Sequence, residues 1–370
     1  MQRVVEGRER EDVRRPRGRT SPGRATSQGP ADRVRALQRT AGNGATARWL
    51  AGGPGTPGRA LQRVRIDDED YETVDSLERA GLGSQVEEGV EADVVAALVK
   101  TAGVYDAEEW AAEVAMRTAV IEGMQILQDS AAYNYNFEAE GIRLPEPWEG
   151  TGRDREAAVP TQGTSTAYAV DAIFGEGEAP PLPDKPAYFL DCSSTMVAVY
   201  YRGMLKALGP NVFAKRFKRE HVVVNVEGLK EVEVPGVGRG TPPSHELWDS
   251  IKLDALDKLL PGDWVYFENY SDYDETHDGP AAVWAGEHAV VLANGTFRGL
   301  GAEGDYETMV GTLRDGYNNP EQGLKQGVKK KKDKELEPSK ESMFTGHLPG
   351  ITEVRRMKNP IKHPTLPAIE

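Results

Sequence analysis

Cysteine is almost absent from this sequence: Cys192 is the only one among 370 residues. A single thiol excludes an internal disulfide and any zinc site built on several cysteines, so covalent cross-links do not stabilise the fold. An isolated cysteine is most often a small buried hydrophobic residue. The residues around Cys192 therefore decide whether it is structural or reactive.

Long apolar runs are also missing. No stretch reaches the roughly 20 apolar residues that cross a bilayer, so we expect no membrane span. The beginning of the sequence, Met-Gln-Arg-Val-Val-Glu-Gly-Arg, lacks the apolar region of a secretory signal peptide. We therefore expect synthesis in the cytoplasm and, if the protein is exported, a route without a signal peptide. The 38% of hydrophobic residues still suffice for a sizeable core.

Acidic residues are scarce at the start of the chain, where residues 1–63 carry 14 arginines against 5 acidic side chains. Glycine and proline are frequent there and aromatic residues nearly absent, so we predict a flexible, disordered basic arm over residues 1–65. The whole chain carries a net charge of -14, which places the excess of acid in the remainder. An acidic body argues against nucleic acid as a partner.

One short pattern interrupts the arm. Leu37-Gln38-Arg39-Thr40-Ala41-Gly42-Asn43 lies on a predicted amphipathic helix, and Leu61-Gln62-Arg63 repeats its first three residues. The string resembles the leader of cargo proteins of bacterial extracellular contractile injection systems. That resemblance implies an export leader, an injection-system particle as partner, and an effector delivered to another cell. The alternative is an Arg-rich linker with no specific role.

Helical periodicity begins near residue 86. Apolar residues at helix spacing predict a helical layer over residues 86–130, in which Asp106 and Glu109 form a capping box. A short helix is predicted over residues 165–174. A third helix begins at Asp191-Cys192 and ends at Gly209-Pro210, a typical stop signal. Cys192 is therefore predicted in the first turn of a helix.

Strand patterns follow the helices. Pro261-Gly262 predicts a turn into a strand that runs to Phe267, and residues 287–292 predict a second strand before a hairpin turn at Asn294-Gly295. A helix followed by antiparallel strands indicates an α+β fold. We predict a catalytic domain over residues 66–325, with its core at 164–318. Residues 326–370, rich in Lys and Pro, are predicted to form a mobile tail.

The predicted position of Cys192 suits a nucleophile. The N–H groups and the dipole at a helix N-terminus lower the pKa of a thiol and offer donors to a developing oxyanion. A thiolate also needs a proton acceptor, and Glu287 and His288 begin a facing strand. Only one of the two can point at Cys192, because adjacent strand residues face opposite sides. Papain-like sites use a histidine on a strand, which favours His288.

Five short motifs follow one another between residues 167 and 316. They are Tyr188-x-x-Asp191-Cys192, Val199-Tyr200-Tyr201, Leu260-Pro261-Gly262-Asp263, Tyr266-Phe267-x-Asn269 and Trp284-x-Gly286-Glu287. In this order and approximate spacing they resemble the bacterial spore-type protein-glutamine gamma-glutamyltransferases, a transglutaminase family with an NlpC-like core. The resemblance implies that Cys192 is the nucleophile and that Glu287 replaces the usual histidine. It also implies that Asp191, where the family has Glu, assists the nucleophile.

The implied reaction is an acyl transfer. Cys192 attacks the side chain of a protein glutamine to form a thioester, and a lysine amine resolves the thioester into an isopeptide cross-link. The partners are then proteins that carry Gln and Lys, and no cofactor is implied. Trp284, beside Glu287, is predicted to line the substrate cleft.

Three alternatives stay open. Water could resolve the thioester, which would give glutamine deamidation, or the chain could be an NlpC-type amidase with His288 as base. In the third alternative it is a non-catalytic cargo or structural protein. The acidic residues from Asp272 to Asp278 suggest a cation site, but they lack the glycine and distal glutamate of a calcium loop. We expect no metal site.

Overall fold

The computed structural model of the chain describes residues 63–84, 88–134, 142–150, 157–224, 232–234, 238–240, 243–252, 256–270, 273, 284–318, 350–364 and 366. A six-stranded sheet with the strand order β10-β15-β11-β12-β13-β14 forms its centre. All neighbouring strands are antiparallel. The strands are β10 (Trp248–Ser250), β11 (Trp264–Glu268), β12 (Gly286–Val291), β13 (Phe297–Gly299), β14 (Glu303–Gly304) and β15 (Gly350–Met357).

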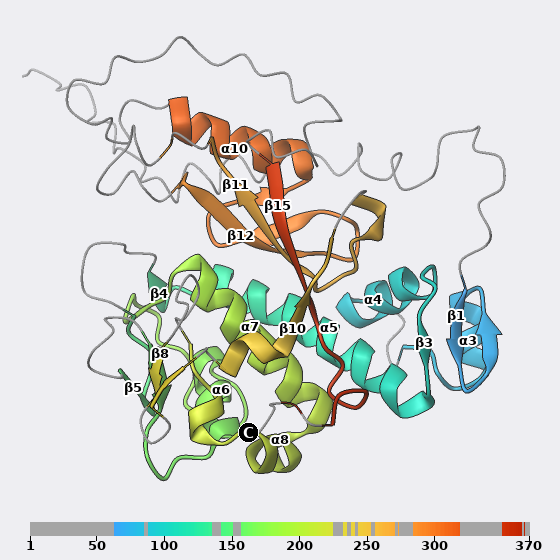
Figure 1. The fold of residues 1–370 in the computed structure, drawn as a ribbon, viewed down its shortest axis with the longest axis horizontal. Coiled ribbons are helices and arrows are strands. Elements are labelled where there is room, and N and C mark those ends of the chain that lie inside the picture. Colours follow the sequence, from blue (N-terminus) through green and yellow to red (C-terminus); the bar gives the residue numbers. More distant parts are fainter. Residues whose placement is uncertain are drawn as a thin grey trace, which may run out of the picture.

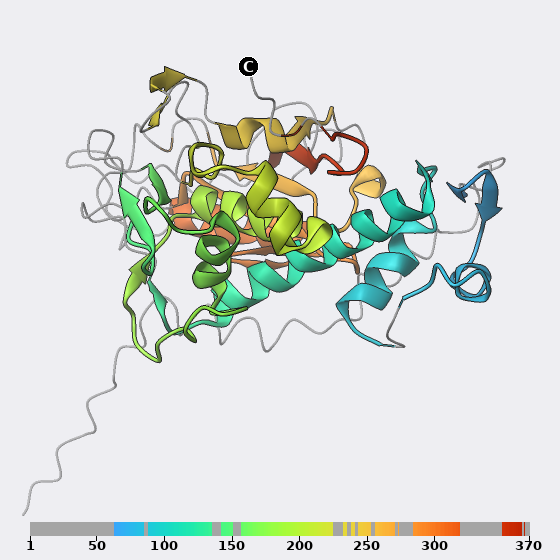
Figure 2. The same ribbon diagram turned by 90° about the horizontal axis from the view of Figure 1, so that it is seen from below.

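Helices cover both faces of this sheet. On one side pack α5 (Ala107–Asp129) and α7 (Cys192–Leu208), and on the other lies α10 (Tyr306–Asn318), as Figures 1 and 2 show. Trp264 and Val290 belong to the core on the first side, which we call the α7 face. Val265 and Ala289 belong to the core on the second side, the α10 face. The predicted α+β class is confirmed; the assignment to a papain-like or NlpC-like core stays a prediction.

The predicted helical layer is present as α4 (Val90–Leu98) and α5. Asp106 and Glu109 form the expected capping box: the Glu109 N–H donates to the Asp106 carboxylate at 2.7 Å, and the Asp106 N–H donates to the Glu109 carboxylate at 3.0 Å. These bonds satisfy N–H groups that the first turn of a helix leaves without an intrahelical partner. They fix where α5 begins and so how it lies on the sheet.

The other predicted boundaries also agree with the structure. Helix α6 spans Thr166–Phe174, and α7 ends before Gly209, whose φ of 74° suits glycine. Pro210 then begins α8 (Pro210–Arg216). Gly262 precedes β11 with a φ of 84° and Gly295 joins β12 to β13 with a φ of 78°, so each turn uses a backbone conformation that glycine adopts freely.

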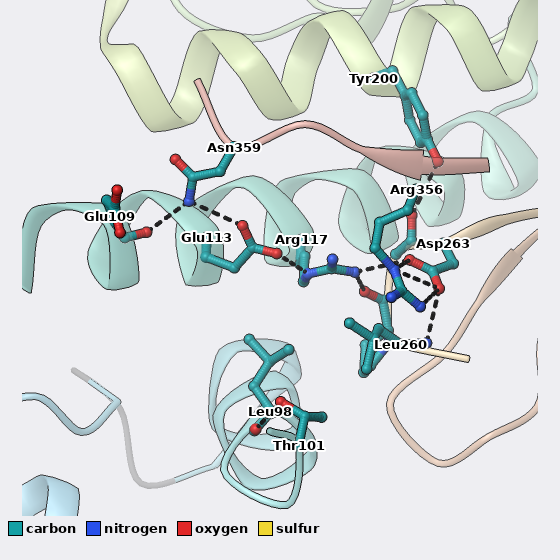
Figure 3. Close-up of polar contacts among 12 residues, drawn as sticks. Leu98, Thr101, Glu109, Glu113, Arg117, Tyr200, Leu260, Asp263, Arg356 and Asn359 are labelled. Atoms are coloured by element: carbon teal, nitrogen blue, oxygen red, sulfur yellow. Dashed lines mark hydrogen bonds and ion pairs between the residues drawn. The ribbon is translucent and has the colours of Figure 1, made fainter. Parts of the chain in front are cut away.

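A chain of buried polar contacts fixes β11 and β15 to α5 (Figure 3). Asp263, fully buried, accepts from Arg117 at 3.2 Å and from Arg356 at 2.7 Å. Arg117 also donates to Glu113 at 2.7 Å, and Asn359 donates to the same carboxylate at 2.9 Å. Arginines on α5 and β15 therefore converge on the carboxylate that precedes β11.

The predicted mobile tail is wrong for part of its length. Residues 350–357 form β15, which lies between β10 and β11 inside the sheet. Ile351 and Val354 are buried on the α10 face and Met357 on the α7 face. A bulge in the pairing with β11 interrupts the alternation of faces, so the segment lacks the period-two pattern of a half-buried strand.

Smaller elements complete the fold, and β1, β2 and α3 lie at one end, away from the central sheet (Figures 1 and 2). The remaining strands are β1 (Val64–Ile66), β2 (Glu69–Tyr71), β3 (Val104–Tyr105), β4 (Tyr133–Asn134), β5 (Trp148–Gly150), β6 (Ala158–Pro160), β7 (Tyr188–Phe189), β8 (Val232–Val234) and β9 (Gly238–Gly240). The remaining helices are α3 (Val74–Arg79) and the 3-10 turns η1 (Arg219–His221), η2 (Pro243–Leu247) and η3 (Leu256–Lys258).

Two predictions fall mainly outside the described residues. The basic arm lies there up to residue 62, and with it the leader-like string at 37–43; β1 begins at Val64, inside the predicted arm. Among the helices that the structure describes, none is long and apolar enough to cross a membrane.

Candidate active site

Cys192 is the first residue of α7, as the sequence predicted. The helix's own hydrogen bonds begin at Thr195, whose N–H donates to the Asp191 carbonyl at 3.1 Å. The N–H groups of the preceding first-turn residues point toward the space in front of the helix, where the dipole is positive. Cys192 is partly exposed. A thiol in this position combines reactivity with access to a substrate.

Asp191 is the N-cap of α7. Its carboxylate accepts from the Ser194 N–H at 2.6 Å and from the Ser193 hydroxyl at 2.8 Å. Both bonds hold the start of the helix and, with it, the position of the neighbouring Cys192. The structure thus gives Asp191 a capping role; its predicted assistance to the nucleophile stays a prediction.

Glu287 and His288 lie on opposite faces of β12. In the pairing of β11 and β12, His288 stands opposite Tyr266 and Glu287 opposite Phe267. Phe267 belongs to the core beneath α10, so Glu287 is on the α10 face. His288 therefore shares the α7 face with the helix that begins at Cys192. The alternation of side chains along β12 therefore shows that His288, and not Glu287, is on the face that α7 covers, a choice that the sequence left open.

Position along α7 confirms that its first turn lies near the start of β12. Gly203 approaches Met357, and one turn earlier Tyr200 donates to the Arg355 carbonyl at 2.9 Å. Each turn toward the start of the helix therefore moves back along β15. β15 and β12 both pair antiparallel with β11, one on each side, so they run in the same direction. Trp264 of β11 stands opposite both Arg355 and Val290. Moving from Arg355 toward the start of β15 therefore corresponds to moving from Val290 toward His288 and Gly286 in β12.

Glu287 is buried, with 2% of its surface exposed. Its carboxylate accepts a hydrogen bond from the Gly301 N–H at 2.9 Å. Burial raises the pKa of Glu287 to about 7, against the lowering effect of the backbone N–H groups of Gly301, Leu300 and Ala302. A carboxyl with this pKa takes up and releases a proton near neutral pH, which is the property of a general base.

A glycine-containing turn links Glu287 to the α7 side of the sheet. A side chain at Gly299 would collide with the Glu287 carboxylate, so the close approach requires glycine. Gln128, near the end of α5, donates to the Gly299 carbonyl at 3.1 Å, and Leu300 packs against the core of the α7 face. The turn at residues 299–301 therefore lies at the same end of the sheet as the start of α7.

His288 is 8% exposed and has aromatic neighbours. Its Nδ1 accepts a hydrogen bond from the Trp264 indole N–H at 2.8 Å. The Tyr266 ring lies against the imidazole with 4.4 Å between the ring centroids. Trp264 in turn packs edge-on against Tyr200 of α7, with centroids 5.8 Å apart. The aromatic cluster holds the imidazole in one orientation.

Trp284 and the Glu287 carboxylate both lie close to Gly301. A Cβ placed at Gly301 would lie 3.1 Å from the Trp284 ring and 3.5 Å from the Glu287 carboxylate. The indole also contacts Gly316 of α10 and is partly exposed. This position beside the carboxylate suits a residue at the edge of a cleft; its role in substrate binding stays a prediction.

Sequence reasoning missed the residues that support this site. Trp264 and Gln128 each make a contact described above, but neither belongs to a pattern that indicates it. The spacing of Gly299 and Gly301 was a usable signal, because glycines close together after a hairpin indicate a close backbone approach. The Trp264 bond to His288 depends on strand register, which the sequence does not reveal.

The acidic segment considered as a cation site lies outside the described residues, apart from Tyr273. Within the part of the chain that the structure describes, no three His, Cys, Asp or Glu residues are grouped as metal ligands would be. The start of α7 provides a thiol and backbone donors, and β12 provides a carboxyl on its α10 face and an imidazole on its α7 face. These groups are suited to covalent catalysis at an acyl carbon.

Comparison with known proteins points in the same direction. The family model for protein-glutamine gamma-glutamyltransferase matches residues 75–323. The protein-glutamine gamma-glutamyltransferase of Halalkalibacterium halodurans is 30% identical over 114 residues, which cover 31% of this chain and 32% of that protein. The corresponding protein of Bacillus licheniformis is 26% identical over 118 residues, covering 31% and 38%. The matched segments thus span about a third of the length of these relatives.

A solved structure gives a weaker match. The transglutaminase from Geobacillus stearothermophilus, without its C-terminal extension, aligns with a TM-score of 0.44 and 16% sequence identity. The alignment covers 69% of this chain and 95% of that one.

Proposed function

Because the chain belongs to the protein-glutamine gamma-glutamyltransferase family, we propose that it is a cysteine-dependent acyltransferase acting on protein glutamine side chains. The observation that carries the proposal is the place of Cys192 as the first, partly exposed residue of α7. No other residue type replaces a thiolate in that reaction, and the chain has no second cysteine.

The first half-reaction forms a thioester. Glu287 lies on the α10 face, so in this proposal its carboxylate takes the proton of the Cys192 thiol past the end of the sheet, at the turn of residues 299–301, and the thiolate attacks the carboxamide carbon of glutamine. The C=O electron pair moves to the oxygen, which backbone donors at the start of α7 stabilise. When the pair returns, the C–N bond breaks, and the proton held on Glu287 passes to the departing nitrogen as ammonia leaves.

The second half-reaction transfers the acyl group. A lysine amine attacks the thioester carbon, the C–S bond breaks, and Cys192 leaves as a thiolate. Glu287 removes the extra proton of the attacking nitrogen and returns it to the sulfur. The products are an isopeptide bond and free enzyme. A pKa near 7 supports this double role, because Glu287 must both accept and release a proton at one pH.

Hydrolysis is the second candidate function, and the position of His288 favours it. Its imidazole is on the α7 face, where an amidase of the papain type places its base. In this alternative His288 activates the thiol and water resolves the thioester, which gives deamidation or peptide-amide cleavage.

Delivery as an effector is a separate proposal. It rests on the resemblance of residues 37–43 to injection-system leaders and on the arginine-rich composition of the arm. A test is whether residues 1–65, fused to an unrelated protein, load it into purified injection-system particles.

The catalytic proposal is tested by incorporation of a labelled primary amine into casein. We expect incorporation by the wild type, and loss of at least about 100-fold in Cys192→Ala and Glu287→Gln, the range for removing a nucleophile or general base. Glu307→Gln is the matched control, an exposed carboxylate on the same face of the sheet. Cys192-dependent ammonia release without incorporation would indicate a deamidase, and absence of both would refute the proposal.

A further inference from the structure

We propose that His288 is a hydrogen-bond donor in this site and not its base. In this inference, which rests on the proposed function, the Nε2–H group of a neutral imidazole donates to the oxygen of the substrate carboxamide. Trp264 is the positioning residue that fixes this tautomer. The proposal therefore assigns the proton transfers to Glu287 and the stabilisation of the oxyanion to His288, together with backbone N–H groups of α7.

The argument begins with the hydrogen bond between Trp264 and His288. An indole N–H is a donor only, so the imidazole atom 2.8 Å from it must be an acceptor. A ring C–H at that distance would repel the N–H group, which excludes the flipped ring. Nδ1 is consequently unprotonated. A neutral imidazole carries one proton, and this proton must then be on Nε2.

The surroundings oppose a change of tautomer. A proton on Nδ1 would face the Trp264 N–H, so the bond would be lost and two donors would oppose each other in a buried site. Trp264 cannot turn away, because it is 1% exposed and packs against both Tyr200 and Trp248. The guanidinium of Arg355 lies over the Trp264 ring, 4.2 Å from its centroid, and adds a positive charge there. The same guanidinium is paired with the Glu353 carboxylate at 2.6 Å.

In an imidazole ring Nε2 is separated from Nδ1 by one carbon, and its N–H bond points in a different direction from the bond that Nδ1 accepts. Trp264 is further along the α7 face, toward Tyr200, while Cys192 is toward the opposite end of the same helix. The imidazole therefore lies between the indole and the level of the first helical turn. A donor in this place is suited to an oxygen held against the start of α7.

The chemistry balances without a proton from His288. When the thiolate attacks, the C=O electron pair becomes a lone pair on oxygen, and the Nε2–H bond to that oxygen shortens and strengthens. When the tetrahedral intermediate collapses, the pair returns and the C–N bond breaks. His288 keeps its proton throughout. This division of roles explains how a buried carboxyl with a pKa of about 7 and an imidazole can both serve one reaction.

The tautomer is measured directly by long-range ¹H–¹⁵N correlation spectra of the protein labelled with ¹⁵N-histidine. Six histidines are present, and His288→Gln identifies the signals of His288 by their loss. We expect Nδ1 to resonate as an unprotonated nitrogen and Nε2 as a protonated one at pH 7. In Trp264→Phe this pattern should give way to a mixture of tautomers. A protonated Nδ1 in the wild type would overturn the proposal.

Kinetics then separate donor from base. Glutamine at position 288 retains an acceptor for Trp264 and an N–H donor beyond it, but it cannot act as a base. We expect His288→Ala to lose roughly 100- to 1,000-fold in kcat with little change in KM, the range for removal of one oxyanion donor. His288→Gln should retain most of the activity and the acidic limb of the wild-type pH profile. Equal loss in both variants would overturn the donor role.

The two failures are distinguishable. If the wild type shows no Cys192-dependent transfer or hydrolysis, the proposed function fails and the donor role fails with it. The spectra still decide the tautomer in that case. If the wild type is active and the spectra show a protonated Nδ1, the inference fails alone.

Discussion

Two buried carboxylates at the starts of neighbouring strands have opposite surroundings. Asp263, just before β11, is paired with Arg117 and Arg356 and accepts from the Leu260 N–H. Glu287, in β12, accepts only from backbone N–H groups, and within the described part of the chain it makes no ion pair. Both are almost inaccessible to water, at 0% and 2% exposure.

The difference in surroundings distinguishes a carboxylate that stabilises the fold from one that can exchange a proton. A buried charge is costly unless cations or hydrogen bonds compensate it. Asp263 has two cations and serves to join α5, β11 and β15. Glu287 has none among the described residues, and burial raises its pKa to about 7, which leaves it able to exchange a proton. A carboxyl without a cation in a buried site is the better candidate for catalysis.

The largest expected effect is at Asp263. Asp263→Ala leaves two arginines without their shared partner, and we expect a loss of about 3–5 kcal/mol in the free energy of unfolding. Denaturant titration measures it. The control is Asp70→Ala in the exposed pair with Arg65, for which we expect no measurable loss because solvent screens the pair. Similar losses in both variants would remove the contrast between a buried and an exposed pair.

Glu287→Gln should raise the free energy of unfolding, whereas Asp263→Ala lowers it. The folded protein holds a proton on Glu287 more tightly than the unfolded chain, so the contribution of Glu287 to stability is fully present below pH 4.5 and is lost as pH rises toward 7. The amide carries no charge, and we expect it to stabilise the protein at pH 8 by about 1–3 kcal/mol, at roughly 1.4 kcal/mol per pKa unit. Unfolding titrations from pH 4 to 8 measure the difference. A gain that is equal at every pH would contradict the raised pKa.

Gly299→Ala tests whether the turn positions the Glu287 carboxylate. The added methyl group displaces that carboxylate, and we expect a loss of roughly 1–3 kcal/mol together with reduced amine incorporation. Gly311→Ala is the matched control, because nothing lies within 4 Å of its added carbon in α10. It should raise the midpoint of thermal unfolding slightly and leave activity unchanged. Full activity in Gly299→Ala would show that the turn does not position Glu287.

The smallest expected effect is at the helix cap. Asp191→Ala removes the acceptor for Ser194 and should cost about 1 kcal/mol, whereas Asp191→Asn preserves the cap and should cost less. Amine incorporation by the Asn variant then reports what the charge of Asp191 adds to catalysis. An Asn variant as unstable as the Ala variant would argue against capping as its structural role.

Local signals made much of the fold predictable. Asp106 and Glu109 define the start of α5, and Gly209-Pro210 defines the end of α7, because both act within a few residues of the chain. β15 was missed because its partners, β10 and β11, are distant in sequence: β11 ends at Glu268 and β15 begins at Gly350. Its charged and apolar residues do not alternate, since a bulge shifts the register beside Tyr266.

The residue types of the site were predictable from the sequence, but the face of β12 on which each side chain lies was not. Alternation requires that Glu287 and His288 diverge, yet every residue of β12 is buried, so polarity does not indicate which face meets α7. That face is set by the register between β11 and β12 and by the helices that pack on each side. The capping role of Asp191, in contrast, follows from its place one residue before the helix.

The position of β15 has a consequence for synthesis on the ribosome. Until residues 350–357 emerge, β11 has no neighbour on one side, and a nascent chain that already contains Cys192, Glu287 and His288 exposes an open strand edge. Such edges invite pairing with other chains. Arg356, which compensates Asp263, arrives in the same segment. The pairing of β11 within the sheet is therefore completed only when residues 350–357 have emerged.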